Sequence, residues 1–205
     1  ARGEVESLDV RSDVYSLGAA FYTLATGLYP SHTGIVNNWL YDPEFDTTFA
    51  YSRSIARESR WWGGDPIWNT ADRQGKRSAT MFWVGSEAPV GGHQPTYWQL
   101  FDAKVPFDAR VAQVLAWIDL PDSLRPDLIM AYFQEPDHTA HDKGPDAPET
   151  RAVVLSVDSV LARLVAGLRE RGLYDKIDLV IVSDHGMSAV SPERVVYLDD
   201  ILDST

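Results

Sequence analysis

Two short apolar runs, each followed at once by carboxylate and imidazole side chains, constrain the fold of this 205-residue chain more than any other feature. The runs occupy residues 127–133 and 178–183. A continuous apolar run of this length predicts a parallel strand that is covered on both faces. Between the runs, apolar residues recur at helical spacing over 153–168. Strand, helix and strand make a βαβ unit, so the two strands are expected to be parallel.

The rest of the chain fits the same α/β class. Helical spacing of apolar residues predicts helices over 13–26 and 107–118, and β-branched and aromatic residues predict a buried strand at 79–84. Residues 28–68 are rich in Pro, Gly, Asn and aromatics, which indicates turns. A length of 205 residues suits a single domain, and no apolar run is long enough to cross a bilayer.

The polar residues that follow the two runs are candidate metal ligands. Asp137 and His141 are four residues apart and can reach one cation, while Asp184 and His185 must splay toward it or toward a second cation. Ligands bind beyond the carboxyl ends of parallel strands, and the chain has no Cys, so any metal must bind His, Asp or Glu. Such ligands in an open cleft favour catalytic zinc, manganese or iron, and two ions could clamp a phosphoryl group. The alternative is that each acid caps a helix and each His is an ordinary surface or core residue.

Charge and aromatic content narrow the classes of ligand that the chain could bind. With 18 basic and 30 acidic residues the net charge is −12, which repels nucleic-acid polymers unless bound metal ions reverse the local sign. Trp62 lies beside Gly63 and Gly64 in a loop, where it either joins the core or stacks on a planar group such as a nucleobase.

From about residue 23 to residue 203, the chain resembles the type I phosphodiesterase and nucleotide pyrophosphatase family of the alkaline phosphatase superfamily. The matching segments are T-G-L-Y-P-S-H-T-G-I-V-N-N (26–38), Y-D-P (41–43), W-W-G-G-D-P-I-W (61–68), F-W-V-G-S-E (82–87), E-P-D-H-T-A-H-D-K-G-P (135–145) and S-D-H-G-M (183–187). The resemblance implies an alkaline-phosphatase-like α/β/α sandwich with a mostly parallel sheet. It also implies two divalent metal ions, most often zinc, and hydrolysis of phosphodiester or pyrophosphate bonds in nucleotides through a covalent nucleotidyl-threonine.

The resemblance assigns roles to particular residues. It implies that Asp137 and His141 bind one zinc ion and that Asp184 and His185 bind the other. The aromatic residues Trp62, as the stacking residue, and Trp83, near the same pocket, would bind the base of a nucleotide or small phosphodiester. By analogy with the family, the protein is expected to act in the periplasm or outside the cell.

The chain departs from the family at its N-terminal end. The family reads K-T-F-P-N-H-Y-T-L-x-T-G, and aligning T-G at 26–27 places Leu17 at the nucleophile and Ala20 at the phosphate-binding Asn. Ser16 could replace the nucleophile only through a shift of register. The two remaining metal ligands are expected upstream of this chain and beyond Thr205, so the fold is expected to be incomplete at both ends and the activity impaired or absent.

Residues 1–27 resemble a different family, the bacterial serine/threonine protein kinases. The string D-V-R-S-D-V-Y-S-L-G (9–18) is similar to the helix after the kinase activation segment, in which the residue matching Asp13 is structural. We therefore expect a chimeric joint between a kinase-like segment (1–27) and a partial phosphodiesterase domain (28–205). Two other functions stay open: a non-catalytic metal- or nucleotide-binding fragment, and a kinase-derived interaction segment.

Overall fold

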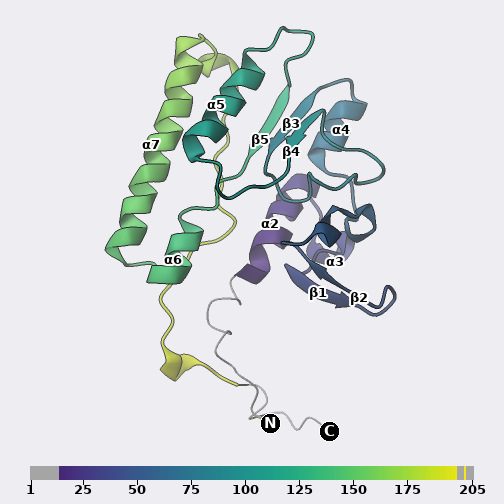
Figure 1. Cartoon of the computed structure of the whole chain (residues 1–205), viewed down its shortest axis with the longest axis vertical. Coiled ribbons are helices and arrows are strands. Elements are labelled where there is room, and N and C mark those ends of the chain that lie inside the picture. The colour runs from purple at the N-terminus through teal and green to yellow at the C-terminus, as the bar shows by residue number, and fades with distance from the viewer. Residues whose placement is uncertain (1–13, 198–200, 202–205) are drawn as a thin grey trace.

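The sheet at the centre of the molecule is parallel (Figure 1). In the computed structural model, which describes residues 14–197 and 201, its strands lie in the order β4–β3–β5. They are β3 (Ser78–Met81), β4 (Tyr97–Gln99) and β5 (Leu128–Ala131). Ala79 of β3 aligns with Tyr97 of β4 on one side and with Ile129 of β5 on the other. The strands expected at 79–84 and 127–133 are thus confirmed in shorter form.

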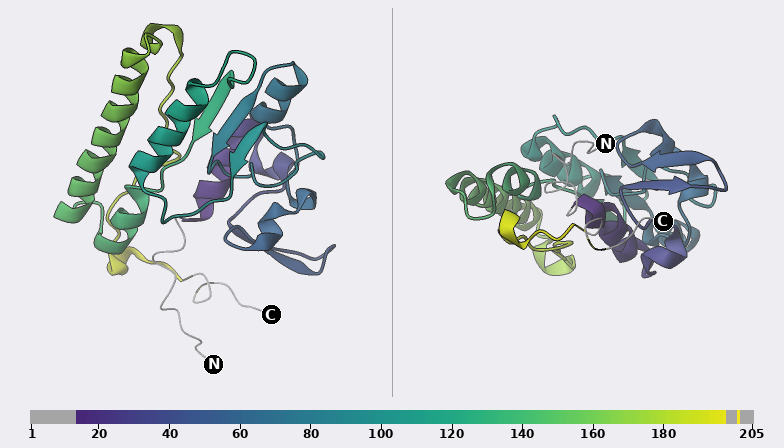
Figure 2. Two further views of the ribbon diagram at one scale, coloured as in Figure 1. Left: turned by 45° about the horizontal axis from the view of Figure 1, so that its top comes forward. Right: turned by 90° about the horizontal axis from the view of Figure 1, so that it is seen from below.

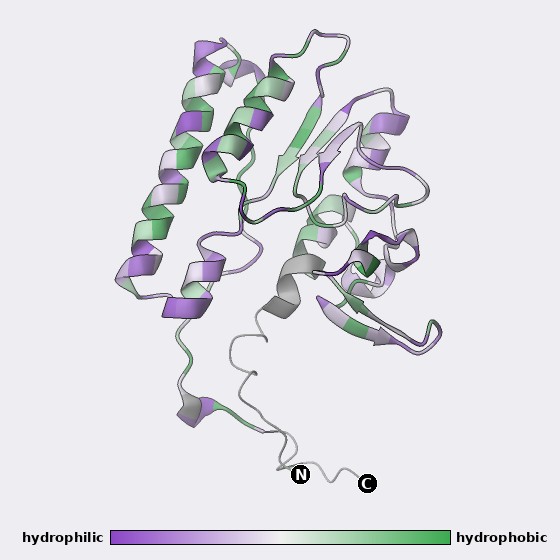
Figure 3. Cartoon of the chain, viewed as in Figure 1, coloured by the Kyte–Doolittle hydropathy of each residue, from purple (hydrophilic) through white to green (hydrophobic). Residues whose placement is uncertain are grey.

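Helices pack around this sheet. α5 (Phe107–Ile118) lies on β3 and β5 and is covered by α7 (Pro148–Glu170). α2 (Val14–Thr26) packs against α4 (Ile67–Arg73), which contacts β3. Figure 2 shows α2 behind the strands and α5 in front of them, and Figure 3 shows apolar residues recurring along α7 between polar ones. The expected helices and the α/β fold are confirmed, and none of the helices in the described residues is long and apolar enough to span a membrane.

Short elements connect the helices and the sheet. Near the N-terminal end, an antiparallel hairpin packs beside a single helical turn. The short elements are α3 (Pro30–Thr33), β1 (Trp39–Asp42), β2 (Thr47–Ala50), α6 (Asp137–Lys143) and 3-10 helices at Ser54–Arg57, Ser59–Trp61, Tyr174–Lys176 and Pro192–Arg194. Turns and short elements therefore dominate residues 28–66, as the Pro and Gly content indicates.

A layer of buried aromatic rings joins α2 to the hairpin and α4. We call Tyr22, Phe49, Trp62 and Trp68 the aromatic layer; all four are at most 4% exposed. The ring of Tyr22 meets the ring of Trp62 edge-on at 4.8 Å between centroids. Gly85 passes so close to the layer that a Cβ atom there would lie 2.9 Å from Trp62 Cζ3 and from Tyr22 Cδ2. This layer anchors the N-terminal half of the chain to the sheet.

The prediction of a strand at 178–183 is wrong. The segment follows an irregular path beyond β5, and Val180 and Ile181 are 77% and 63% exposed. A cavity of about 930 Å³ is lined on one side by β5 and on the other by residues 176–187. Because that cavity separates the segment from β5, its backbone does not hydrogen-bond to the strand. The crossover helix of the expected βαβ unit is therefore present, whereas the second strand is not formed.

The kinase-like segment (1–27) is described only from residue 14 onward. Residues 1–13, including Asp13, lie outside the described residues. Residues 14–26 form α2.

Candidate metal centre

Four side chains from two distant segments meet beyond the carboxyl end of β5. Asp137 and His141 lie on α6, and their spacing places them on one face of that helix, with 3.3 Å between Asp137 Oδ1 and His141 Nε2. Asp184 and His185 come from the irregular segment after α7. We call these four residues the Asp137 cluster.

The two halves of the Asp137 cluster are in contact. His185 Nε2 lies 3.7 Å from Asp137 Oδ1 and 3.3 Å from Asp184 Oδ2. The cluster is also partly shielded from water, since the side chains of His141 and Asp184 are each 10% exposed. The structure thus brings together the four residues that the sequence analysis selected as candidate ligands.

These contacts leave four buried atoms without hydrogen-bond partners. They are Asp137 Oδ1, His141 Nε2, Asp184 Oδ2 and His185 Nε2. Buried polar atoms in native proteins are nearly always hydrogen-bonded, and leaving one unpaired is costly. Four unpaired atoms in one place indicate a bound group that would satisfy them together.

The protonation of His185 suits a metal ligand. Its Nδ1 lies 2.8 Å from the backbone carbonyl of Gly186. A carbonyl can only accept, so Nδ1 carries the proton, and in the neutral ring Nε2 keeps its lone pair. Such a bond from the second ring nitrogen to a carbonyl also fixes the orientation of metal-binding histidines.

Burial and charge act together on the acids of the cluster. Burial raises the pKa of the Asp137 carboxyl above its usual range; the Asp184 and Glu135 carboxylates act in the same direction, while His141 and His185 oppose it. Burial also raises the pKa of the nearby Tyr132 hydroxyl, and the charges of Asp137 and Asp184 reinforce the effect. A bound cation would relieve this concentration of negative charge.

The cluster fits a metal ion in its chemistry but is not arranged as a finished site. Carboxylate oxygens and imidazole nitrogens are suitable zinc ligands. Within the described residues, however, no three His, Asp or Glu donors gather around one point as a bound metal ion requires. The four atoms form a chain of contacts instead, so metal binding would need small side-chain shifts.

The cavity beside β5 is lined by Asp137, Asp184 and His185 of the Asp137 cluster and has aromatic residues in its wall. Trp83, which follows β3, and Tyr132, which follows β5, both line it. Trp83 Nε1 donates to the carbonyl of Phe21 at 3.3 Å, and the Trp83 and Phe21 rings meet edge-on at 5.2 Å. Trp62 lies elsewhere, in the aromatic layer, where its Nε1 donates to Ala56 O at 2.7 Å. Of the two tryptophans chosen as base-binding candidates, Trp83 lies at this cavity and Trp62 is enclosed by the core.

The nucleophile candidates lie on α2. Ser16 and Leu17 belong to this helix, which begins at Val14, but their side chains are outside the described part. The assignment of Leu17 to the nucleophile position, and of Ser16 as its replacement, therefore stays a prediction.

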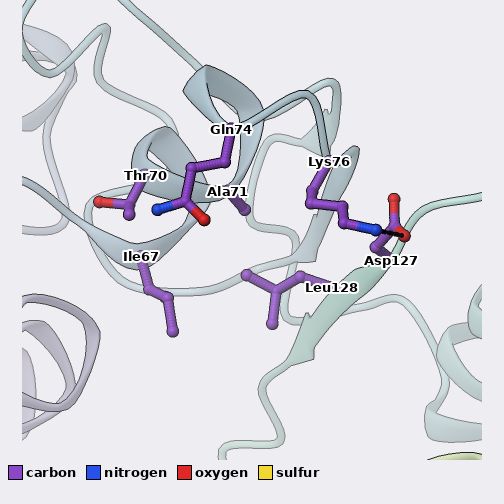
Figure 4. A pocket seen from close by; sticks show the side chains of 7 residues that line it. All are labelled: Ile67, Thr70, Ala71, Gln74, Lys76, Asp127 and Leu128. Atoms are coloured by element: carbon purple, nitrogen blue, oxygen red, sulfur yellow. Dashed lines mark hydrogen bonds and ion pairs between the residues drawn. The ribbon is translucent and has the colours of Figure 1, made fainter.

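A second hollow lies at the other end of the sheet (Figure 4). It measures about 450 Å³ and is lined by Ile67, Thr70, Ala71, Gln74, Lys76, Asp127 and Leu128. Its one ion pair joins Lys76 Nζ to Asp127 Oδ1 at 3.1 Å, and it holds none of the candidate site residues. The candidate metal ligands therefore lie at the Asp137 cluster and not at this hollow.

Sequence reasoning missed several residues near the cluster. Tyr132 is the last residue but one of the first apolar run and follows β5 directly, and a polar tip at that position was a usable signal. Phe101 lies 6.1 Å from the Tyr132 ring and is 38% exposed, and no local pattern distinguished it. Both rings belong to the loops at the carboxyl edge of the sheet.

Comparison with known proteins shows which sequences and structures the chain resembles. The family model described as type I phosphodiesterase / nucleotide pyrophosphatase matches residues 18–205. A venom phosphodiesterase from Crotalus durissus collilineatus is 43% identical over 183 residues, which cover 89% of this chain and 22% of that protein. Human ectonucleotide pyrophosphatase/phosphodiesterase family member 1 is 36% identical over 88% of this chain and 20% of its own length. The chain thus spans about a fifth of the length of these curated relatives.

Solved structures agree with the fold. Murine ectonucleotide pyrophosphatase/phosphodiesterase 5 superposes with a TM-score of 0.83 at 34% identity, covering 93% of this chain and 52% of that one. An inactive variant of the same murine protein in complex with AMP gives a TM-score of 0.82 at 35% identity, covering 93% of this chain and 51% of that one. The sheet and its surrounding helices are therefore those of this group of structures.

Proposed function

Because the chain belongs to the type I phosphodiesterase / nucleotide pyrophosphatase family, we propose that its function is metal-dependent hydrolysis of phosphodiester or pyrophosphate bonds in nucleotides, in an impaired form. The observation that carries this proposal is the Asp137 cluster, whose four unpartnered atoms meet beside a cavity with aromatic walls. The relatives are named as phosphodiesterases and pyrophosphatases, which are hydrolases.

Each part of the site would have a separate role. Asp137 and His141 would hold one divalent ion and Asp184 and His185 the other, with zinc the best match to these donors. When bound, such ions supply positive charge that polarises a phosphoryl oxygen. Trp83 and the ring of Tyr132 would contact the base of a nucleotide in the cavity, as would Trp62 if the core around it opened.

The position of the nucleophile is where this chain departs most from the family. The family's Thr and Asn positions align with Leu17 and Ala20, whose alkyl side chains can neither attack phosphorus nor hold a phosphate oxygen. Ser16 lies one residue away on the same helix and would serve only after a shift of register. We therefore propose that zinc binds weakly and that turnover is slight or absent.

The test compares the wild-type chain with two histidine variants of α6. Zinc stoichiometry is measured by atomic absorption after dialysis, and turnover is measured with bis(4-nitrophenyl) phosphate. We expect His141→Ala to lose zinc, while His138→Ala, an exposed neighbour on the same helix, keeps it. Turnover by wild type above the His141→Ala level would overturn the proposed impairment, and equal zinc contents in all three proteins would overturn the ligand assignment.

A second candidate is nucleotide binding without turnover. It is favoured by the aromatic wall of the cavity and by the fact that a related protein in inactive form was solved with AMP. Calorimetric titration of AMP into wild type and Trp83→Ala tests it. Binding by wild type that is weakened in Trp83→Ala, with no hydrolysis, supports this reading; no heat of binding excludes it.

The N-terminal joint and the location of the protein complete the proposal. We propose that residues 1–27 are a kinase-like segment fused to the phosphodiesterase body; the family match begins within that segment, at residue 18. Long sequencing reads that show an intact K-T-F-P-N-H segment upstream would contradict the fusion. The venom and ectonucleotide names of relatives support action outside the cytoplasm, which cell fractionation of the producing organism would check.

A further inference from the structure

Arg110 is a buried cation that the proposed reaction does not use. It lies on α5 and is 0% exposed. Its guanidinium carbon is 4.9 Å from the ring centroid of Phe82 and 4.9 Å from that of Phe107. The rings of Phe133 and Phe101 are at 5.9 and 6.0 Å. The charge is thus surrounded by aromatic faces, which attract a cation.

Arg110 donates hydrogen bonds to two backbone carbonyls from different segments of the chain. Nε donates to the carbonyl of Val105 at 3.2 Å, and Nη1 donates to the carbonyl of Tyr132 at 3.0 Å. Nη2 has no hydrogen-bond partner. Within the described residues, no carboxylate forms an ion pair with this guanidinium. Burial lowers the pKa of the Arg110 guanidinium, and the Asp102 carboxylate opposes this effect without forming an ion pair. A buried charge without a directly paired carboxylate is costly, so an apolar residue would suit the position better if packing were its only purpose.

The partners of Arg110 share one edge of the sheet. Phe82 follows β3, Phe101 follows β4, and Tyr132 and Phe133 follow β5. One side chain therefore connects the segments that leave the carboxyl ends of the three strands of the parallel sheet. The segment after β5 leads within five residues to Asp137, the first member of the Asp137 cluster.

We propose that Arg110 is a positioning residue, which fixes the backbone after β5 and so holds Asp137 and α6 in place to bind the metal ion. The role of Arg110 in metal binding rests on the proposed function, whereas its ordering of the segment after β5 does not. The planar guanidinium can stack between rings and donate to two carbonyls at once, which a lysine ammonium cannot reproduce.

Two measurements on Arg110→Met and Arg110→Lys test the proposal. Hydrogen exchange by mass spectrometry on the metal-free protein reports the order of residues 132–141, and competition with a zinc chelator reports affinity. We expect Arg110→Met to exchange faster at 132–141 while β3 stays protected, and to bind zinc about tenfold more weakly, the range seen for supporting residues of metal sites. Arg110→Lys should restore part of both losses.

The matched control is Val160→Ala, which removes a buried apolar side chain from α7, outside the lining of the cavity. It should lower the melting temperature and leave the zinc affinity per folded molecule within about twofold, since changes away from the site add little to binding. If Arg110→Met lowers only the melting temperature, as Val160→Ala does, the residue is part of the core and the proposal is wrong.

The design separates two kinds of failure. If wild type binds no zinc, the metal assignment fails, and hydrogen exchange at 132–141 still decides whether Arg110 orders this segment. If Arg110→Met does not fold, Arg110→Lys decides: faster exchange confined to 132–141 supports the proposal, and exchange equal to wild type overturns it.

Discussion

The aromatic layer and the Asp137 cluster both shield polar atoms from water, but those atoms are hydrogen-bonded in the layer and lack partners in the cluster. In the layer, the Tyr22 hydroxyl donates to Gly63 O at 3.0 Å and Trp62 Nε1 donates to Ala56 O at 2.7 Å. In the cluster, four carboxylate and imidazole atoms lie together with no hydrogen-bond partner. Atoms without partners also occur elsewhere, such as Trp68 Nε1 in the core, but none of those atoms belongs to an acid or a histidine. The gathering of such atoms in one place distinguishes a binding site from imperfect packing.

The two regions are therefore expected to serve different properties: the aromatic layer stabilises the fold, and the Asp137 cluster binds a metal ion. Changes in the aromatic layer should destabilise the fold and affect ligands only through unfolding. Changes in the Asp137 cluster should weaken metal binding and leave the metal-free fold intact, because four polar atoms of that cluster have no hydrogen-bond partner until a cation is present.

The largest effect is expected from Gly85→Ala. The residue has φ +82°, and a Cβ atom would lie 2.9 Å from Trp62 Cζ3 and from Tyr22 Cδ2. Overpacking and the left-handed backbone together should lower the free energy of unfolding by about 2–4 kcal/mol, measured in urea. Gly92→Ala is the matched control: its φ is +81° but no atom lies within 4 Å, so about 1 kcal/mol is expected. Equal losses in the two variants would mean that the layer is loosely packed.

Tyr22→Phe should have a smaller effect in the same layer. It removes the hydroxyl that pairs with Gly63 O and keeps the ring against Trp62. A loss of about 1–2 kcal/mol in the free energy of unfolding is expected, because a buried carbonyl loses its donor. An unchanged urea midpoint would show that water replaces the hydroxyl.

In the Asp137 cluster, Asp137→Asn should have the opposite sign. It removes a half-buried charge whose Oδ1 lacks a hydrogen bond, so the metal-free protein should be unchanged or more stable by up to about 1 kcal/mol. Asp142→Asn, an exposed acid on the same helix, provides the baseline. A large loss of stability in Asp137→Asn alone would show that the acid already supports the fold without metal.

The smallest effect is a pH dependence at the far end of β5. The backbone N–H of Arg77 and the ammonium of Lys76 hold the pKa of Asp127 below its usual range. A lowered folded-state pKa stabilises the fold above the unfolded pKa, and this stability is lost as pH falls through the folded value. Asp127→Asn should therefore flatten the decline in melting temperature below about pH 4. Asp158→Asn, on the exposed side of α7, should keep the wild-type slope.

Local patterns in the sequence were sufficient for much of the fold. Apolar spacing located α2, α5 and α7, and the apolar run at 127–133 located β5, because these segments bury a face against neighbours within the described chain. The same reasoning failed at 178–183. A strand also needs a hydrogen-bonding neighbour, and the segment is separated from β5 by the cavity.

The site was partly predictable for the same reason. Two apolar runs ending in acid and histidine indicated a shared edge, and Asp137 and His185 do lie within 3.7 Å of each other. Arg110 was not predicted, because charged residues are rarely fully buried and no local motif marks this one as an exception. Its position three residues after Phe107, on the apolar face of α5, was the available signal. The burial of Trp62 depended on contacts with Tyr22 and Phe49, which no local pattern encodes.

The most direct test of the account is the effect of zinc on unfolding. Urea denaturation of wild type and of Asp137→Asn is compared with and without the metal. At free zinc about ten times the dissociation constant of the Asp137 and His141 site, binding there should raise the free energy of unfolding of wild type by about 1.4 kcal/mol. The rise should be smaller by that amount in the variant, which keeps only the proposed second pair of ligands, Asp184 and His185. No zinc-dependent rise in wild type, or an equal rise in both proteins, would contradict the claim that the Asp137 cluster is a metal site.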